Sequence, residues 1–422
     1  MLKRVAITDL EMGMFVHKME GSWFSHPFWK AKFLIDDAER LDTLRSSNLD
    51  GVVIDTSKGR DLTAANNIGR QSRKPAVAPS TASQADRFRA VKARSAIQND
   101  PVSTEAELQT AQAIAGRAQK AIHSTFIAAR LGKAINVKTV QPVVTDILDS
   151  VRRNPHAFSG LMRCKLKNEL GYQHALAVSA LMVSLARQMK LSQDDVLEAG
   201  LAGLLLDIGT NYLPQIPDLP NNDFRNADPK VWQQHVILGF RALQNDDSLP
   251  QTVLNACLEH HERIDGGGFP KGLQRDEIST IGQMAAICDT FDFLLTGTAS
   301  TRALDPAAAV QHMCKMEGAF DAEILRSFIE SVGLFPIGSF VELRSGKIAL
   351  VIDEDPGDKG HPIVQAFYDC KTRDRIVPHR IVLAQSVNDD EIIGIADLSG
   401  LDLPDEAQLR EMVFLTAHKM VH

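Results

Sequence analysis

The run from residue 260 to 270, His-His-Glu-Arg-Ile-Asp-Gly-Gly-Gly-Phe-Pro, constrains the fold more than any other stretch of this chain. Successive residues on a regular helix point about 100° apart, so His260 and His261 can face one point only where a helix ends or is distorted. The three glycines and the proline behind them predict such an end, because they favour a loop whose backbone can approach a ligand closely. A polar helix end is the alternative for a His-His pair alone, but the glycine-rich loop favours a metal-binding or phosphate-binding site.

Length and composition predict an ordinary multidomain protein. A chain of 422 residues is too long for one hydrophobic core, so two or three domains are expected. A net charge of −7 argues against a chain that coats nucleic acid, and no nucleic-acid partner is expected. No apolar run approaches the roughly 18 residues of a membrane helix, no secretory signal is visible, and the five cysteines show no CxxC spacing. These features predict a cytoplasmic protein with reduced thiols.

The first three segments of the chain differ in pattern. Short strands around a helix predict a small α+β domain over residues 1–60. Residues 61–103 are rich in alanine, serine and proline and carry an excess of arginine and lysine, which predicts a flexible basic linker. From 104 to 335 nearly everything reads as helix joined by short loops, which predicts an α-helical bundle.

The end of the chain reads differently from the bundle. Alternating apolar residues predict a small antiparallel β subdomain over residues 336–390, and a polar C-terminal tail follows over 391–422. The expected fold class is therefore multidomain and mainly α, with a small α+β domain before the bundle and a small β subdomain after it.

Five ionisable side chains lie within or at the ends of otherwise apolar helices of the predicted bundle: His174, Asp207, His235, Asp289 and Asp292. Taken singly, each is typical of a satisfied core or helix-end polar group. Taken together with the paired histidines of the glycine-rich run, they place four imidazoles and two or three carboxylates on separate helices of one bundle. Such a set suits divalent iron, manganese, nickel or zinc.

The block HHERIDGGGFP, followed by KGLQRDEIS and ICDTFDFLL, resembles the defining region of the HD-GYP proteins, a branch of the HD metal-dependent phosphohydrolases. The N-terminal segment resembles the small domain that often precedes HD-GYP modules in bacterial signalling proteins. The resemblance covers about residues 1–60 and 165–335, and it implies an HD-type helical bundle. It also implies hydrolysis of cyclic di-GMP to pGpG or GMP at a site of two or three metals, which activate water and stabilise charge on the phosphodiester.

The resemblance assigns roles residue by residue. It implies catalytic roles for Asp207, His260 and His261. The implied metal ligands are His174, Asp207, His235, His260, His261 and Asp289. The family geometry would place Asp207, His235, His260 and His261 around one metal, and His174, Asp207, Asp289 and the side chain at 206 around the other. The implied substrate-binding residues are Arg263, Asp265, Gly266, Gly268, Phe269, Pro270 and Arg302.

The chain departs from the family pattern at four places. Leu206 stands where the family has the histidine of its His-Asp pair, so one ligand of the second metal is absent. Thr210 replaces a lysine that would meet a substrate phosphate, and Phe269 lacks the hydroxyl of the GYP tyrosine. The basic segment RPYR aligns with 298–301, Thr-Ala-Ser-Thr, where Arg302 could substitute only in part. We therefore expect about one divalent transition metal per chain.

Two functions remain open from the sequence. The first is a degenerate HD-GYP protein in cyclic di-GMP signalling, which binds metal, has weak or no phosphodiesterase activity, and acts by binding the nucleotide or a signalling protein partner. The alternative is an active metal-dependent cyclic di-GMP phosphodiesterase that yields pGpG or GMP.

Overall fold

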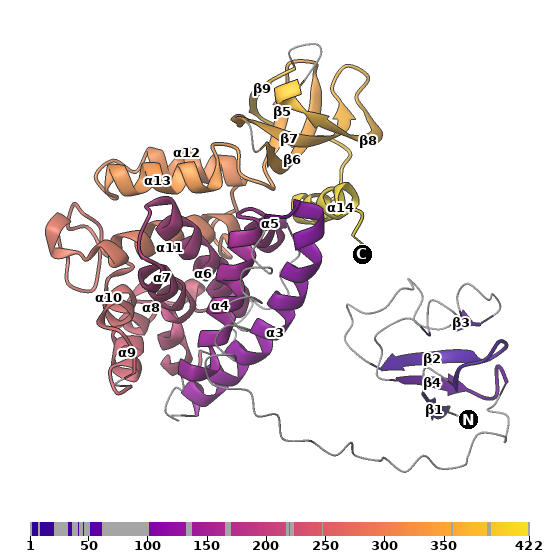
Figure 1. Cartoon of the computed structure of the whole chain (residues 1–422), viewed down its shortest axis with the longest axis horizontal. Helices are drawn as coiled ribbons and strands as arrows, with labels where there is room; N and C mark the ends of the chain where they lie inside the picture. Colours follow the sequence, from indigo (N-terminus) through magenta and orange to yellow (C-terminus); the bar gives the residue numbers. More distant parts are fainter. Residues whose placement is uncertain are drawn as a thin grey trace, which may run out of the picture. The chain divides into compact units, whose positions relative to one another are not determined.

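The computed structural model describes most of the chain. The described residues are 2–6, 9–20, 33–35, 41, 45, 51–60, 101–131, 137–164, 170–216, 219, 223–246, 248–355, 358–385 and 390–420. The chain forms two compact units, residues 1–89 with 420–422, and residues 90–419. It is mainly helical and has one antiparallel sheet in each unit, as the fold class predicted (Figure 1).

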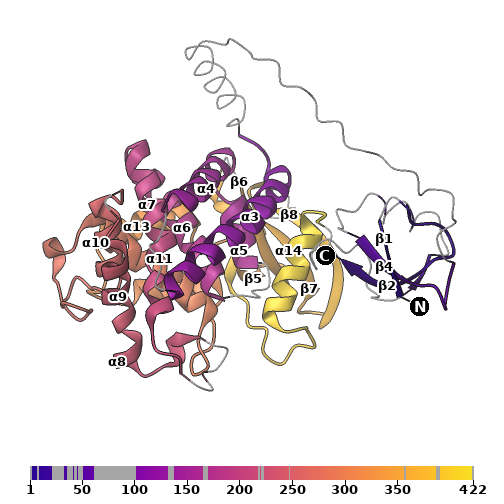
Figure 2. The same ribbon diagram turned by 90° about the horizontal axis from the view of Figure 1, so that it is seen from below.

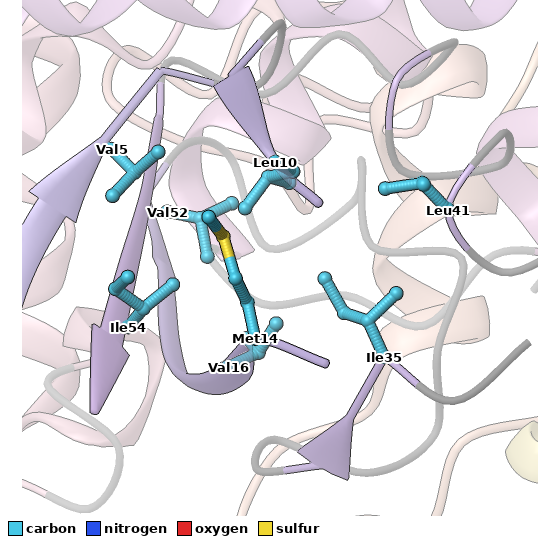
Figure 3. Close-up of a cluster of buried hydrophobic side chains, with 8 residues drawn as sticks. All are labelled: Val5, Leu10, Met14, Val16, Ile35, Leu41, Val52 and Ile54. Atoms are coloured by element: carbon cyan, nitrogen blue, oxygen red, sulfur yellow. The ribbon is translucent and has the colours of Figure 1, made fainter. Parts of the chain in front are cut away.

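The N-terminal unit is built on a four-stranded antiparallel sheet of order β1-β4-β2-β3. Its strands are β1 (Leu2–Val5), β2 (Phe15–Glu20), β3 (Phe33–Leu34) and β4 (Gly51–Asp55). Eight buried apolar side chains form its core (Figure 3): Val5, Leu10, Met14, Val16, Ile35, Leu41, Val52 and Ile54. The helix expected between strands of this domain falls mostly outside the described residues, and so does the linker predicted at 61–103, except for its last three positions.

The second unit begins with a helical bundle. Its first half comprises α3 (Thr104–Arg130), η3 (Val137–Thr139), α4 (Gln141–Arg153), α5 (Ala157–Cys164), α6 (Leu170–Gln188), α7 (Gln193–Leu205), η4 (Ile208–Tyr212) and η6 (Phe224–Asn226). Its second half comprises α8 (Pro229–Trp232), α9 (Gln234–Leu243), α10 (Gln251–Glu259), η7 (Arg275–Glu277), α11 (Thr280–Thr296), α12 (Pro306–Cys314) and α13 (Ala322–Val332). In the described part of the chain, no helix has the length and apolar character needed to cross a bilayer.

The long helix α3 is tied to the bundle by its buried face. Ser103 caps its N-terminus by accepting a hydrogen bond from the Ala106 amide. Glu107 is buried and accepts two hydrogen bonds from the Arg153 guanidinium of α4, at 2.7 and 2.8 Å. Because a buried carboxylate needs such a partner, this ion pair holds the first turn of α3 against α4.

The second unit ends in a five-stranded antiparallel sheet of order β8-β7-β6-β5-β9. Its elements are β5 (Phe340–Leu343), β6 (Lys347–Asp355), β7 (Asp358–Asp369), β8 (Asp374–Val382), η8 (Leu383–Gln385) and β9 (Ile392–Ile395). Helix α14 (Glu406–Ala417) lies against β6, β7 and β8 (Figures 1 and 2). Strand β9 pairs with β5, so the sheet continues beyond the boundary expected at residue 390, and the tail is part of this subdomain.

Candidate metal centre

The six predicted metal ligands come together in the helical bundle. His174 lies on α6, His235 on α9 and Asp289 on α11, whereas Asp207 lies between α7 and η4. His260 and His261 follow directly on α10. Their ligand atoms form two groups, each with all atoms within 4.8 Å of one another. Cluster A comprises Asp207, His235, His260 and His261, and cluster B comprises His174, Asp207 and Asp289.

The paired histidines face one site because α10 ends at Glu259, as the glycine-rich run predicted. The amide of Glu262 donates to the Glu259 carbonyl at 2.8 Å, which closes a turn after the helix. The loop then folds back, and the Phe269 amide donates to the His261 carbonyl at 3.1 Å. A Cβ at Gly268 would lie 2.5 Å from that same carbonyl oxygen, so only glycine fits the return of the chain.

A buried carboxylate holds this loop in shape. Glu262 accepts hydrogen bonds from the amides of Lys271 at 2.7 Å and Leu273 at 3.0 Å. These bonds join the first and last parts of the loop and satisfy the carboxylate without a metal. Glu262 is therefore a structural residue of the loop that presents His260 and His261.

Asp207 reaches cluster A because η4 packs directly on the backbone of α9. A Cβ at Gly209 would lie 1.9 Å from the His235 carbonyl oxygen and 2.5 Å from the Gly239 amide nitrogen. Only a residue without a side chain allows this approach. The close packing places Asp207, two residues before this glycine, beside the imidazole of His235.

The hydrogen bonds of cluster A leave three acceptor atoms facing one another. His235 Nδ1 donates to the Trp232 carbonyl at 2.6 Å, and His260 Nδ1 donates to the Cys257 carbonyl at 2.9 Å. Since a carbonyl oxygen only accepts, each ring carries a proton on Nδ1, and its Nε2 is the nitrogen that faces the site. These two Nε2 atoms lie 3.2 Å apart, and Asp207 Oδ1 lies 3.2 and 3.4 Å from them.

Such an arrangement fits a bound cation. Ligand atoms about 2.0–2.1 Å from one zinc-like ion lie roughly 3.0–3.4 Å from each other, which matches the three distances of cluster A. Asp207 Oδ1 and His261 Nε2 are also buried without a hydrogen-bond partner in the described part of the chain. A divalent ion would satisfy all of these atoms at once, and imidazole with carboxylate suits iron, manganese, nickel or zinc.

Cluster B shares Asp207 and adds a second carboxylate. His174 Nε2 lies 3.1 Å from Asp289 Oδ1 and 3.4 Å from Asp207 Oδ2, while its Nδ1 donates to Asp292 Oδ2 at 2.8 Å. A carboxylate behind a ligand histidine fixes its ring and raises its basicity. Asp292 therefore positions His174, a role that the sequence alone did not assign to it.

The charged groups of the two clusters shift one another's pKa values. Burial lowers the pKa of His174, but the carboxylates of Asp207, Asp289 and Asp292 outweigh it and raise that pKa well above the usual range. Burial raises the pKa of Asp207, but the surrounding histidines lower it well below the usual range. Burial, with the neighbouring imidazoles, lowers the pKa of His261 well below the usual range. Without metal, cluster B thus holds a proton on His174, whereas His261 is neutral.

The two replaced positions add no ligand to either cluster. Leu206 is buried among apolar side chains, and its carbonyl accepts a hydrogen bond from Cys257 Sγ at 3.4 Å. The Thr210 hydroxyl donates to the Asp207 carbonyl at 2.8 Å, so it supports the turn that carries Asp207. Cluster B accordingly has three candidate ligands where cluster A has four.

The loop residues predicted to bind substrate mostly serve the loop itself. The Phe269 ring stacks on His261 with centroids 4.5 Å apart, and Pro270 follows it through a cis bond. Gly266 adopts a φ of +81°, and Asp265 Oδ1 accepts a hydrogen bond from the Gly267 amide. Gly268, as described above, lies where the loop folds back onto the backbone of His261.

The two predicted substrate-binding arginines are engaged elsewhere. Arg263 donates to the Glu262 carbonyl and to Thr290 Oγ1, and its guanidinium lies 5.2 Å from the Phe320 ring centre. Arg302 is exposed and forms an ion pair with Glu406 at the start of α14. A substrate role for either side chain stays a prediction.

A cavity of about 650 Å³ opens beside the two clusters. His174, Asp207 and Thr210 form part of its wall. The rest of the lining includes four aromatic residues and two arginines: Phe126, Tyr172, Phe224, Trp232, Arg130 and Arg225. Sequence reasoning missed these six residues, because they come from four elements and follow no local motif.

Comparison with known proteins agrees with this geometry. The family described as "HD domain" matches residues 161–324, and the family described as "Domain of unknown function (DUF3391)" matches residues 2–140. A Pseudomonas aeruginosa protein named as a cyclic di-GMP phosphodiesterase is 35% identical over 397 residues, which cover 93% of this chain and 92% of that protein. The chain belongs to the HD-GYP family.

Other similar proteins match shorter parts. A Thermotoga maritima protein named as a cyclic di-GMP phosphodiesterase is 32% identical over 126 residues, or 30% of this HD-GYP chain and 34% of that protein. Among solved structures, Bd1817, an HDG"Y"P protein from Bdellovibrio bacteriovorus, has a TM-score of 0.46 and 18% identity. The match covers 78% of this chain and 99% of the Bd1817 chain.

Proposed function

We propose that this HD-GYP protein acts in cyclic di-GMP signalling by binding one divalent transition metal in cluster A and cyclic di-GMP in the adjoining cavity, with slow or no hydrolysis. The observation that carries this proposal is the set of three facing acceptor atoms on Asp207, His235 and His260. Family membership and the names of the relatives support the choice of nucleotide.

The residues of cluster A would hold the ion in defined ways. His235 and His260 would bind it through Nε2, because their Nδ1 protons are held by backbone carbonyls. Asp207 would add an anionic oxygen, and Phe269 would keep the His261 ring in place by stacking on it. A divalent ion held there polarises a phosphate oxygen and activates water for attack.

Slow turnover follows from what the replaced positions lack. Leu206 has no ligand atom, and the Thr210 hydroxyl is bonded to a carbonyl where the family has a cation. The segment from Thr298 to Thr301 forms internal hydrogen bonds, and the hydroxyl oxygens of Thr298 and Thr301 lie 2.7 Å apart. Two-metal hydrolysis needs both ions to stabilise the attacking and leaving oxygens. The loss of one ion would cost several kcal/mol, a rate loss on the order of a thousandfold.

An active phosphodiesterase is the second candidate, and cluster B favours it. Asp207 offers Oδ1 to cluster A and Oδ2 to cluster B, so it could bridge two ions. Asp292 orients His174 for the same role. In this alternative, three protein ligands suffice for the second ion, and the products are pGpG or GMP.

Metal content and turnover measured together decide between the two functions. Full-length protein purified without chelator should contain about one transition metal per chain and turn over cyclic di-GMP far more slowly than a complete HD-GYP enzyme under the same manganese or iron conditions. Two metals that survive a mild chelator wash, with comparable turnover, would establish the active phosphodiesterase instead. Protein that binds no metal would refute both.

If turnover is absent, the signal passes through binding alone. The nucleotide-bound protein would then act on a signalling protein partner, as the sequence suggested. Affinity capture with and without cyclic di-GMP tests this part of the proposal, since a partner that is retained equally in both conditions would contradict it.

A further inference from the structure

Helix α3 supplies an aromatic ring and a cation to the cavity beside the metal clusters. Phe126 packs against Tyr172 with ring centroids 5.3 Å apart and planes at 46°. Tyr172 lies two residues before His174 on α6, so this ring pair begins next to cluster B. Arg130 is the last residue of α3 and lines the same cavity. Both α3 residues lie outside the range 161–324 that matches the HD domain, and inside the N-terminal match to residue 140.

The two arginines of the cavity differ in how their charges are used. Arg225 donates to both carboxylate oxygens of Asp223 and to Thr296 Oγ1, so its charge is compensated within the protein. Arg130 is exposed and forms no ion pair with any residue that the structure describes. Among the described residues of the lining, its charge is thus the one open to an anionic ligand. Thr210, where the family has lysine, lines the same cavity.

We infer that Phe126, Tyr172 and Arg130 form a second subsite for a cyclic dinucleotide whose first phosphate lies at the metal clusters. This inference rests on the proposed function. A cyclic dinucleotide carries two phosphates and two bases, and a single metal centre engages one phosphate. Arg130 binds the phosphate remote from the metals through charge-assisted hydrogen bonds, and the Phe126–Tyr172 pair gives one base a stacking surface.

The size of the cavity agrees with such a ligand. Its volume of about 650 Å³ lies within the range of roughly 300–1,000 Å³ typical of small-molecule sites. The arrangement also places a cation, from an element outside the HD domain, in the cavity that Thr210 lines. The upstream helix is therefore part of the nucleotide site and sets its preference for a dinucleotide over a mononucleotide.

Calorimetric binding of cyclic di-GMP and of GMP to the full-length, metal-loaded protein tests the subsite. Arg130→Gln should weaken cyclic di-GMP binding by about tenfold or more and leave GMP binding unchanged, because GMP has only the phosphate that reaches the metals. Arg130→Lys should recover part of the affinity. Arg117→Gln is the matched control on α3, since this exposed arginine pairs with Asp146 and does not line the cavity.

Stacking is tested separately at Tyr172. Tyr172→Leu should weaken cyclic di-GMP binding several-fold, whereas Tyr172→Phe, which keeps the ring, should not. Metal content and melting temperature are measured for every variant. A Leu variant that keeps its metal and binds cyclic di-GMP as tightly as the wild type, or a Phe variant that loses as much affinity as the Leu variant, would overturn the stacking role.

The outcomes separate this inference from the proposed function. Wild-type protein that binds cyclic di-GMP, with Arg130→Gln no weaker than Arg117→Gln, overturns the subsite and leaves the proposed function standing. Equal losses for cyclic di-GMP and GMP also overturn it, because the cation would then act on the metal-side phosphate. Metal-loaded wild-type protein that binds no cyclic di-GMP refutes the proposed function, and the subsite with it.

Discussion

Asp207 links the two clusters, because its two carboxylate oxygens face different histidines. Oδ1 lies 3.2 Å from His235 Nε2, and Oδ2 lies 3.4 Å from His174 Nε2. The histidines hold the pKa of this half-buried carboxyl well below its usual range, against the effect of burial. An ionised carboxylate with both oxygens directed into the site is suited to hold cations on either side.

Asp292→Asn should leave the metal of cluster A in place, and under the alternative of an active phosphodiesterase it should weaken binding of the second ion at cluster B. The amide oxygen can still accept the His174 Nδ1 proton, but the lost negative charge makes Nε2 a poorer ligand. Replacing such a partner typically costs about 10- to 100-fold in metal affinity. Metal titration against a competing chelator measures the two affinities, and equal losses at both clusters would contradict the assignment.

His261→Ala tests cluster A, as Asp292→Asn tests cluster B. It removes one of four ligands and leaves Asp207 as a half-buried charge with less compensation, which is costly. We expect lower metal content and a lower melting temperature than in the wild-type protein. Unchanged values for both would show that cluster A binds no metal.

At the scale of elements, close backbone packing decides where the ligands lie. Element η4 lies on α9 through Gly209, and α10 ends where the loop returns through Gly268. Both contacts bring main-chain atoms closer than any side chain would permit. The site geometry therefore depends on two glycines that are not themselves candidate ligands.

Gly209→Ala should separate η4 from α9 and move Asp207 away from His235. A Cβ there would overlap the His235 carbonyl oxygen, so a loss of stability of about 1–3 kcal/mol or more is expected, together with loss of metal. Gly116→Ala in α3 is the control, since no atom lies within 4 Å of its Cβ and it should stabilise by about 0.5–1 kcal/mol. Denaturant unfolding and metal analysis check both variants, and a metal-replete Gly209→Ala protein would refute the prediction.

Helix α14 should detach more readily in acid because of His418. Its Nε2 donates to the Ile352 carbonyl at 3.1 Å, and burial lowers its pKa below 6.5. The unfolded chain therefore takes up the proton first, so this contribution to stability is complete above pH 6.5 and is lost as the pH falls through the lowered pKa. The difference in melting temperature between wild type and His418→Asn should shrink from pH 7.5 to 5.5, and a constant difference would contradict this.

At the scale of the whole molecule, the site belongs to one unit. All six candidate ligands and every described residue that lines the cavity lie within residues 90–419, and the N-terminal unit has its own apolar core. Every candidate ligand that the structure describes therefore comes from the second unit.

A fragment that begins at residue 101 should fold and bind as much metal as the full chain. It keeps α3, which is joined to the bundle by the ion pair between its Glu107 and Arg153 of α4. Circular dichroism and elemental analysis of the fragment and the full chain measure this. A folded fragment that has lost its metal would show that the N-terminal unit completes the site.

The sequence alone determined the features that depend on local chemistry. The glycines behind His260 and His261 predicted the end of α10, and apolar periodicity predicted a helical bundle between a first and a last sheet. The family motif then placed six ligand candidates that the structure brings within reach of one another. These predictions succeed because a helix end, a periodic apolar face and a motif each depend on residues that lie close together in the sequence.

Only the tertiary structure decided which distant residues meet. Asp292 acts on His174 across 118 positions of sequence, and Phe126 and Arg130 reach the cavity from a helix that precedes the HD domain. Strand β9 joins the C-terminal sheet by pairing with β5, although its residues read as a polar tail. No local pattern encodes these contacts, because they arise from the packing of elements whose relative positions depend on the whole core.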